Sequence, residues 1–161
     1  MNKNTDNILG KLEWIGVRDK SEGIFSTKSV IAIQGLGLEG DKITSRKSKK
    51  RQVTLMQKEH ISVILSLARE NDQEKIKKIM YFFKRNLLIS NYNVLNLKGN
   101  YFKIGEAEFY GTGDCKPCKK ITDMLGRPMY EAMQGMGGIT ASVEKTGLIK
   151  INDKLTMGTH Q

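Results

Sequence analysis

The sequence is poor in cysteine and proline, with two of each among its 161 residues, and it lacks long apolar runs. Two cysteines are too few for a disulfide scaffold. The longest apolar runs, such as Leu87-Leu88-Ile89, fall far below the roughly 20 residues that a membrane-spanning helix needs. Residues 1–7 are polar and lead into mixed sequence, not into the apolar core of a signal peptide. We therefore expect a cytoplasmic protein with reduced thiols and no membrane contact.

Acidic residues are absent from one part of the chain. The sequence has 27 Lys and Arg residues against 17 Asp and Glu residues, a net charge of +10. Residues 42–58 contain seven of the basic residues and no acidic one, which leaves a net charge of only +3 for the rest. Such a local excess favours an anionic partner, either nucleic acid or a small phosphorylated ligand, and it is also typical of a solvated loop. Nucleic acid is the weaker candidate, because this window has no aromatic residue for base stacking.

Short apolar runs between turn residues recur along most of the chain and predict a mainly β protein. Hydrophobic residues at helical spacing predict two helices in the middle, at residues 57–69 and from the N-cap Asp72 to Phe83. Two further short helices are expected, one with Pro117 at its first position and Gly126 at its end, and one at residues 127–134. These elements favour a mainly β (α+β) fold, a barrel with short helical insertions. The expected strands are residues 8–17, 29–33, 52–56, 87–89, 94–97, 101–104, 107–110, 139–143, 148–151 and 154–157.

Three glycines, Gly35, Gly37 and Gly40, match the spacing of a dinucleotide-binding loop. Such a loop opens an apolar helix, whereas the residues after Gly40 are polar and basic without helical periodicity. We therefore interpret these glycines as residues that permit a positive φ in a tight turn. That turn would bring Asp41 and the basic window together.

Cys115 and Cys118 form a Cys-x-x-Cys motif, which several kinds of chemistry use. A zinc site needs four ligands, and His60 and His160 do not stand at a recognised spacing, so zinc bound within one chain is disfavoured. A thioredoxin-like redox pair is disfavoured because that fold requires a proline from a distant strand. Both prolines of this chain lie within the motif or shortly after it.

A reactive thiolate is the third interpretation of the motif. Three nearby lysines and the start of a helix would lower the pKa of a sulfur there. Cys118 would lie in the first helical turn, whereas Cys115 precedes it beside Asp114. We therefore expect Cys118 to be the essential sulfur and Cys115 to accept a disulfide or persulfide from it. Two ordinary buried thiols are the structural alternative.

Four ordered segments carry a family resemblance. They are Gly37-Leu38-Glu39-Gly40-Asp41 with Arg51-Gln52-Val53-Thr54-Leu55 and Glu59; Arg85-Asn86-Leu87; Leu97-x-Gly99 through Phe102-x-Ile104-Gly105-Glu106-Ala107 to Cys115-x-Pro117-Cys118; and Gly137-Gly138-Ile139-x-Ala141-x-Val143 to Gly147-x-Ile149. As an ordered set they resemble the MOSC family, which is named after the C-terminal domain of molybdenum-cofactor sulfurases and includes small stand-alone bacterial proteins. The match extends over about residues 8–157, so we expect residues 1–161 to form a single MOSC-like domain with its core there. Asn152 stands where the family usually has glycine, and asparagine tolerates the left-handed conformation.

The resemblance implies a MOSC-type β-barrel that binds the molybdenum cofactor, a pterin with a terminal phosphate and an oxo-metal centre. In this family the functional cysteine, which corresponds to Cys118, is proposed to carry a sulfane sulfur or to ligate molybdenum. The family is also associated with pyridoxal phosphate binding. Catalytic roles are thereby implied for Cys118 and Cys115. The implied cofactor-binding residues are Gly40, Asp41, Arg46, Lys49, Arg51, Arg85, Asn86 and Lys116.

The residue chemistry agrees with such a ligand. Arg51 and Arg85 can bind anionic oxygens through planar guanidinium groups, and a thiolate suits sulfur transfer or a soft metal. Lys47, Lys49 and Lys50 are expected to steer the ligand from the rim. Three activities stay open: sulfur transfer with a cysteine-desulfurase-type donor or with molybdenum enzymes, reduction of a substrate with external electron donors, and delivery of the cofactor. Whether the protein is an enzyme is therefore also open.

Overall fold

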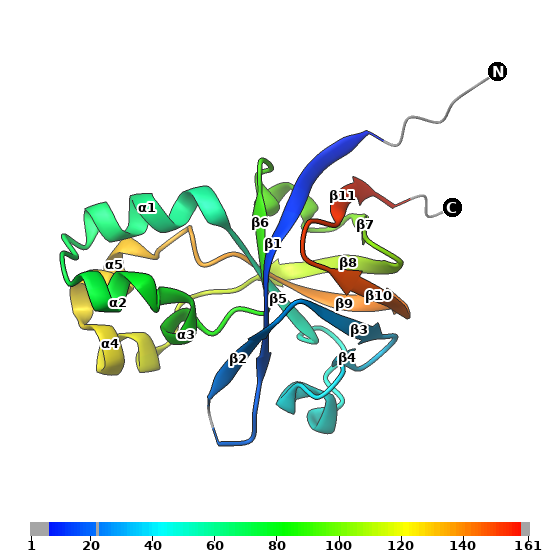
Figure 1. Ribbon diagram of the computed structural model, residues 1–161, viewed down its shortest axis with the longest axis horizontal. Coiled ribbons are helices and arrows are strands. Elements are labelled where there is room, and N and C mark those ends of the chain that lie inside the picture. Colours follow the sequence, from blue (N-terminus) through cyan, green and yellow to red (C-terminus); the bar gives the residue numbers. More distant parts are fainter. Residues whose placement is uncertain (1–6, 22, 159–161) are drawn as a thin grey trace.

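The computed structural model describes residues 7–21 and 23–158, and its main feature is a closed β-barrel (Figure 1). The barrel strands are β1 (Ile8–Arg18), β5 (Val53–Gln57), β6 (Leu87–Ser90), β7 (Tyr101–Ile104), β8 (Ala107–Asp114), β9 (Ile139–Lys145) and β11 (Lys154–Met157). Within the described residues these seven strands pair in the order β1, β11, β7, β8, β9, β5, β6 and back to β1. All neighbours are antiparallel except β5 and β6, which run parallel.

The remaining strands lie outside the closed ring. Strand β2 (Ile24–Thr27) pairs with the second half of β1. A separate three-stranded sheet is formed by β3 (Ser29–Ile33), β4 (Gly37–Leu38) and β10 (Gly147–Lys150), with β3 in the middle. About 39% of the chain is strand and 28% is helix, which confirms the expected mainly β barrel with short helices.

The barrel is filled by apolar side chains from every strand of the ring. Leu12, Ile15 and Leu55 are fully buried, and Phe102 and Phe109 stack across paired strands with ring centroids 5.4 Å apart. Full burial of one such side chain contributes roughly 1.5–3 kcal/mol to folding. This core makes the barrel a rigid support for the loops at its ends.

Among the described residues, five short α-helices gather beside the barrel, on the left in Figure 1. They are α1 (Lys58–Leu67), α2 (Gln73–Lys77), α3 (Ile79–Phe83), α4 (Lys119–Leu125) and α5 (Arg127–Ala132). The first three connect the parallel strands β5 and β6, and the other two connect β8 to β9. A second apolar core joins the helices to the barrel, and its buried members include Met56, Ile64, Phe83, Ile121 and Met133. The two insertions therefore pack on each other, which brings residues 82–85 close to α4.

Three local predictions were wrong. Residues 94–97 form the 3-10 helix η2 (Val94–Leu97) instead of a strand, because the Asn93 side chain caps the backbone N–H of Leu95. The helix expected from Asp72 to Phe83 is divided at Lys78 into α2 and α3, although Asp72 is the N-cap as predicted. Helix α4 begins at Lys119, so Pro117 precedes the helix instead of occupying its first position.

The turn predictions are confirmed where the backbone requires left-handed geometry. Gly35, Gly37 and Gly40 have φ values of 75°, 129° and 82°, as expected for a tight turn. Asn152 has φ 74° in the final turn and so replaces glycine there. No helix in the described residues combines the length and apolar character needed to cross a membrane. His160 and residues 1–6, which entered the zinc and signal-peptide interpretations, lie outside the described residues.

Candidate functional site

A buried carboxylate organises the first half of the site. Asp41 is 1% exposed and caps the 3-10 helix η1 (Lys42–Arg46) by accepting a hydrogen bond from the backbone N–H of Ile43 at 2.9 Å. The same carboxylate accepts three hydrogen bonds from Arg18: from its backbone N at 2.9 Å, and from Nε and Nη2 at 3.2 Å each. Burial alone would raise the pKa of Asp41, but the hydrogen bonds and charge of Arg18 outweigh burial and lower this pKa below its usual value. Asp41 is therefore the counter-ion that fixes Arg18.

Asn86 connects this ion pair to the barrel. Its Nδ2 donates to Asp41 Oδ2 at 2.8 Å and to the Gly16 carbonyl at 2.9 Å. Its Oδ1 accepts from the backbone N of Thr54 at 3.0 Å. Asn86 is fully buried, and both its amide nitrogen and its amide oxygen make hydrogen bonds. The network therefore joins β1, β5 and η1 through Asn86, the residue that precedes β6.

A cavity of about 320 Å³ opens beside this network, and we call it the cationic cavity. Its lining combines basic side chains from η1, from the end of β1 and from both helical insertions with apolar walls. No Asp or Glu is among the described residues that line it. The lining residues are Arg18, Lys42, Ile43, Arg46, Arg51, Phe82, Phe83, Lys84, Arg85, Cys118, Lys120, Ile121 and Met124. Seven positive charges beside apolar and aromatic walls suit a flat ligand that carries anionic groups.

Arg85 is the most deeply placed of the cations. Its side chain donates from Nε to the Gly137 carbonyl at 2.8 Å, from Nη1 to the Phe83 carbonyl at 2.9 Å and from Nη2 to the Cys115 carbonyl at 3.4 Å. Arg85 is only 7% exposed, and burial lowers the pKa of its guanidinium below the usual value. In the described part of the chain no carboxylate pairs with it, and its hydrogen bonds go to three backbone carbonyls. An anion in the cavity would supply the missing counter-charge.

The two cysteines differ in exposure and in the space that they face. Cys118 is exposed, lines the cationic cavity and is the N-cap residue of α4, with an extended backbone and no capping bond from its side chain. Cys115 is 1% exposed and lines a separate cavity of about 210 Å³ next to the glycine-rich loop at Gly135 and Gly137. Its Sγ lies 3.8 Å from Nη2 of Arg51. Of the two cysteines, the exposed one is thus the one that lines the cationic cavity.

The structure brings together part of the predicted site. Arg46, Arg51, Arg85 and Cys118 all line the cationic cavity. The other six predicted residues do not line it. Asp41 and Asn86 form the network described above, Gly40 belongs to the preceding turn, and Lys49 is exposed elsewhere. Cys115 and Lys116 line the separate cavity of about 210 Å³.

Four lining cations were not among the predicted cofactor-binding residues: Arg18, Lys42, Lys84 and Lys120. Lys120 had been expected only as one of the three lysines near the cysteines. Two of the four had a usable signal, since Lys42 follows Asp41 directly and Lys84 precedes the Arg85-Asn86 pair. Arg18 had none, because 23 residues separate it from Asp41 and only the folded chain joins them.

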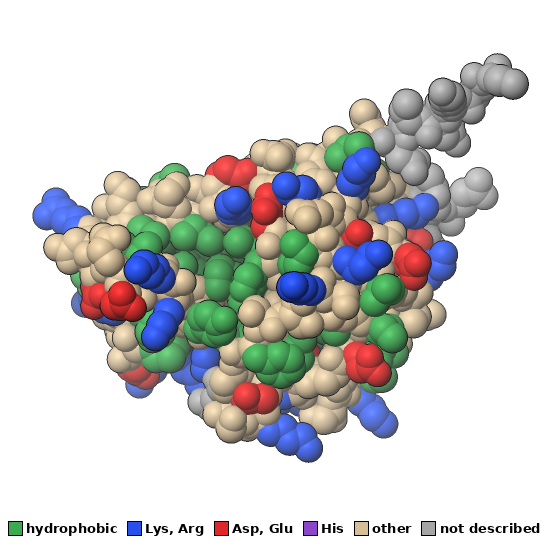
Figure 2. Space-filling view, in the orientation of Figure 1, with side chains coloured by type: hydrophobic (Ala, Val, Ile, Leu, Met, Phe, Trp, Pro, Cys, Tyr) green, Lys and Arg blue, Asp and Glu red, His purple; other side chains and the backbone are tan. Residues whose placement is uncertain are grey.

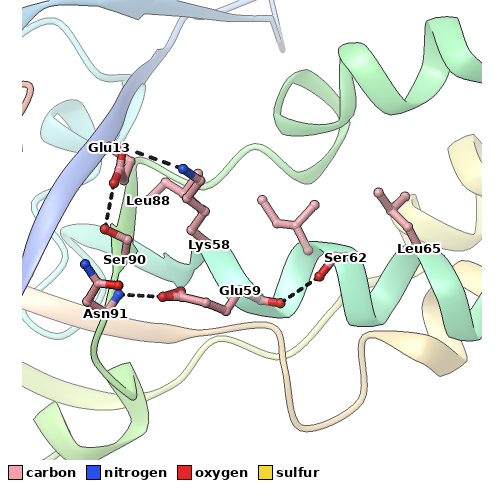
Figure 3. Close-up of a pocket in the computed structure, with 9 residues that line it drawn as sticks. Glu13, Lys58, Glu59, Ser62, Leu65, Leu88, Ser90 and Asn91 are labelled. Atoms are coloured by element: carbon pink, nitrogen blue, oxygen red, sulfur yellow. Dashed lines mark hydrogen bonds and ion pairs between the residues drawn. The ribbon is translucent and has the colours of Figure 1, made fainter.

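A larger cavity lies elsewhere, and we call it the α1 groove. Its volume is about 540 Å³, and Ile61, Leu65 and Leu88 form its apolar floor. Figure 2 shows hydrophobic side chains gathered on this face beside α1. Figure 3 shows Glu13 turned toward Lys58 at the polar end, where their ion-pair distance is 3.8 Å. This groove has no sulfur and a mixed set of charges.

No metal centre made of protein ligands alone is present in the part of the chain that the structure describes. Within residues 7–21 and 23–158, no three His, Cys, Asp or Glu side chains are grouped so that they could hold a metal ion.

Comparisons with known proteins agree with the fold. The family model for the MOSC domain matches residues 41–156. A crystal structure of the YuaD protein from Bacillus subtilis superimposes with a TM-score of 0.78 at 17% identity, covering 94% of this chain and 97% of that one. YiiM from Escherichia coli gives 0.65 at 22% identity, with 94% and 71% covered, and YiiM from Geobacillus stearothermophilus gives 0.60 at 12% identity, with 94% and 74% covered. Among curated proteins, none matches the chain significantly.

Proposed function

The chain belongs to the MOSC domain family, and from that premise we propose that it binds the molybdenum cofactor in the cationic cavity, with Cys118 as its working sulfur. The family is linked to molybdenum-cofactor proteins. The observation that carries the proposal is the buried Arg85, which lacks a carboxylate partner among the described residues and shares one cavity with an exposed thiol. A phosphorylated pterin with a thiophilic metal fits both features.

The residues of the cavity have different roles in this proposal. Arg85 and Arg51 offer guanidinium N–H groups to anionic oxygens, and Arg18, whose charge Asp41 balances, lines the same cavity. The apolar wall, which includes Phe82, suits the flat pterin ring. When bound, the cofactor would supply a metal centre that exchanges oxygen or sulfur ligands. The role of Cys118 is to present a thiolate to that centre.

In the sulfur-carrier form of this proposal, the Cys118 thiolate attacks the outer sulfur of a persulfide R–S–SH on a donor protein. The S–S bond of the donor breaks, R–S⁻ leaves as a thiolate, and Cys118 becomes Cys118–S–SH, so that no external oxidant is needed. A cysteine-desulfurase-type protein is the donor class that this chemistry requires. The positive charges around Cys118 stabilise both thiolates during the exchange.

Mass spectrometry of the protein as purified tests the proposal. We expect a bound pterin in the native spectrum, or the mass of one added sulfur on the peptide that contains Cys118. Cys118→Ser should lose the added sulfur or the retained molybdenum, whereas the matched variant Cys115→Ser should keep part of it. Full retention in Cys118→Ser would contradict the role given to this sulfur.

Two other functions remain as outcomes of the same work. Retained cofactor, together with substrate-dependent oxidation of an added electron donor, would show a reductase. Binding of random-sequence nucleic acid that falls steeply with salt, without affinity for a pterin, would instead show a basic nucleic-acid-binding module.

A further inference from the structure

We propose that Cys115 is a positioning residue, which holds the Arg51 guanidinium at the cationic cavity, and that it is not a second reactive sulfur. The inference rests on the proposed function only in treating Cys118 as the reactive thiol. It concerns the second cysteine of the motif, for which the proposed function has no use.

Both backbone groups of Cys115 are fixed by hydrogen bonds. Its N–H donates to the Gly138 carbonyl at 2.9 Å, and its carbonyl accepts from Arg85 Nη2 at 3.4 Å. Gly137 allows this close approach, because a Cβ at that position would collide with the Cys115 carbonyl. The 1% exposed sulfur therefore has a defined place and little access for a reagent.

Arg51 has the opposite character. It is exposed, and its backbone N donates to Ser48 Oγ at 3.1 Å. Among the described residues, the one hydrogen-bond partner of its guanidinium is Cys115 Sγ, at 3.8 Å from Nη2. A free arginine side chain samples many rotamers, so this contact selects those in which the charge lies at the cavity. Without the sulfur, we expect the guanidinium to turn toward solvent.

A sulfur is suited to this task because it is a weak, uncharged acceptor. Arg18 shows the alternative, since the Asp41 carboxylate that holds it also neutralises its charge. A thiol at Cys115 orients Arg51 and leaves its positive charge available to an anion. It also leaves the guanidinium free to rearrange when a ligand offers a stronger acceptor.

Alkylation of Cys118 can report the position of Arg51 without any cofactor. The probes are iodoacetate, which is an anion, and iodoacetamide, which is neutral and of similar size. Peptide mapping gives the rate at Cys118 with each reagent, and the ratio of the two rates measures the positive potential at this sulfur. The intact protein and its variants Cys115→Ala, Arg51→Ala and the double variant are compared, with Lys49→Ala as a control for an exposed cation outside the cavity.

Arg51→Ala should lower the ratio at least about threefold. Cys115→Ala should cause most of the same loss, and it should add nothing in the Arg51→Ala background. Cys115→Ser, which keeps a hydrogen-bond acceptor, should retain most of the ratio of the intact protein. Lys49→Ala should change the ratio little.

An unchanged ratio in Cys115→Ala, or an equal further loss in the Arg51→Ala background, would overturn the proposal. So would labelling of Cys115 before Cys118. Thermal melting checks that each variant is folded, and Cys115→Val gives the same test if the alanine variant unfolds. The proposed function can fail by the cofactor measurement while this ratio behaves as expected, so the two failures are distinguishable.

Discussion

The cationic cavity and the α1 groove differ more in their charged side chains than in their volume. The groove is the larger, at about 540 Å³ against about 320 Å³. Its Glu13 already has a hydrogen bond from Ser90 Oγ at 2.7 Å and ion pairs with Lys11 and Lys58 at 3.5 and 3.8 Å. The smaller cavity instead gathers seven cations without a carboxylate in its described lining. The buried Arg85, which no carboxylate of the described residues pairs with, is therefore a stronger reason than volume to propose the smaller cavity as the ligand site.

The two regions also differ in how firmly the protein holds their charges. Arg18, Asp41 and Asn86 are each less than 10% exposed and are connected by hydrogen bonds of 2.8–3.2 Å. Lys58 in the groove is 55% exposed at its side chain and makes only a long ion pair. Buried pairs are costly to break from one side, whereas exposed pairs contribute little. Mutations should therefore separate the two regions clearly.

Asp41→Ala should have the largest effect. It leaves Arg18 buried without its counter-ion and removes the cap of η1, so we expect a loss of about 3–5 kcal/mol in the free energy of unfolding. Urea denaturation followed by circular dichroism measures the change. The matched variant Glu13→Ala, in the groove, should lose about 1 kcal/mol or less. Equal losses would remove the distinction between the two regions.

Arg51→Ala should weaken anion binding about tenfold, because it removes charge-assisted hydrogen bonds to the ligand. Titration calorimetry with inorganic pyrophosphate at fixed ionic strength measures the affinity. Lys49→Ala and Lys58→Ala are controls that remove the same charge outside the cavity, and each should have a small effect. Equally small changes in all three variants would indicate a diffuse surface patch.

Acidification should produce a smaller effect that depends on Asp41. Because the pKa of Asp41 is lowered in the folded protein, its contribution to stability is present above its unfolded pKa of about 3.9 and is lost as pH falls through the lower folded value. The urea midpoint should therefore change little between about pH 7 and 5 on account of this residue, and fall below about pH 4. Asp41→Asn should show a smaller acid-induced fall than the wild type. An identical fall in both proteins would assign the acid sensitivity to other groups.

Much of the barrel could be predicted, because most of its strands correspond to local patterns of apolar residues between turn residues. Runs such as residues 101–104 and 139–143 have apolar residues bounded by turn residues, and both are strands. Residues 94–97 are also a short, mainly apolar run, but Asn93 caps them as a 3-10 helix. A short apolar run does not by itself distinguish these conformations.

The candidate site was predictable only where its residues are close in sequence or belong to a motif. Arg51, Arg85 and Cys118 were expected together, and all three line the cavity. Arg18 was missed because its link to Asp41 exists only through folding. Lys116 was included for its position in the motif, but it lines the neighbouring cavity at Cys115, since residues 115–118 pass between the two spaces. Local spacing identifies residue types, and the topology decides which of them meet.

Hydrogen–deuterium exchange with and without inorganic pyrophosphate tests most directly that the cationic cavity, and not the larger groove, is the ligand site. We expect slower exchange in peptides covering residues 42–51 and 118–125, which border the cationic cavity. Peptides covering residues 58–65 and 88–91, which border the α1 groove, should be unchanged. Protection confined to the groove peptides, or none at saturating pyrophosphate, would contradict the account.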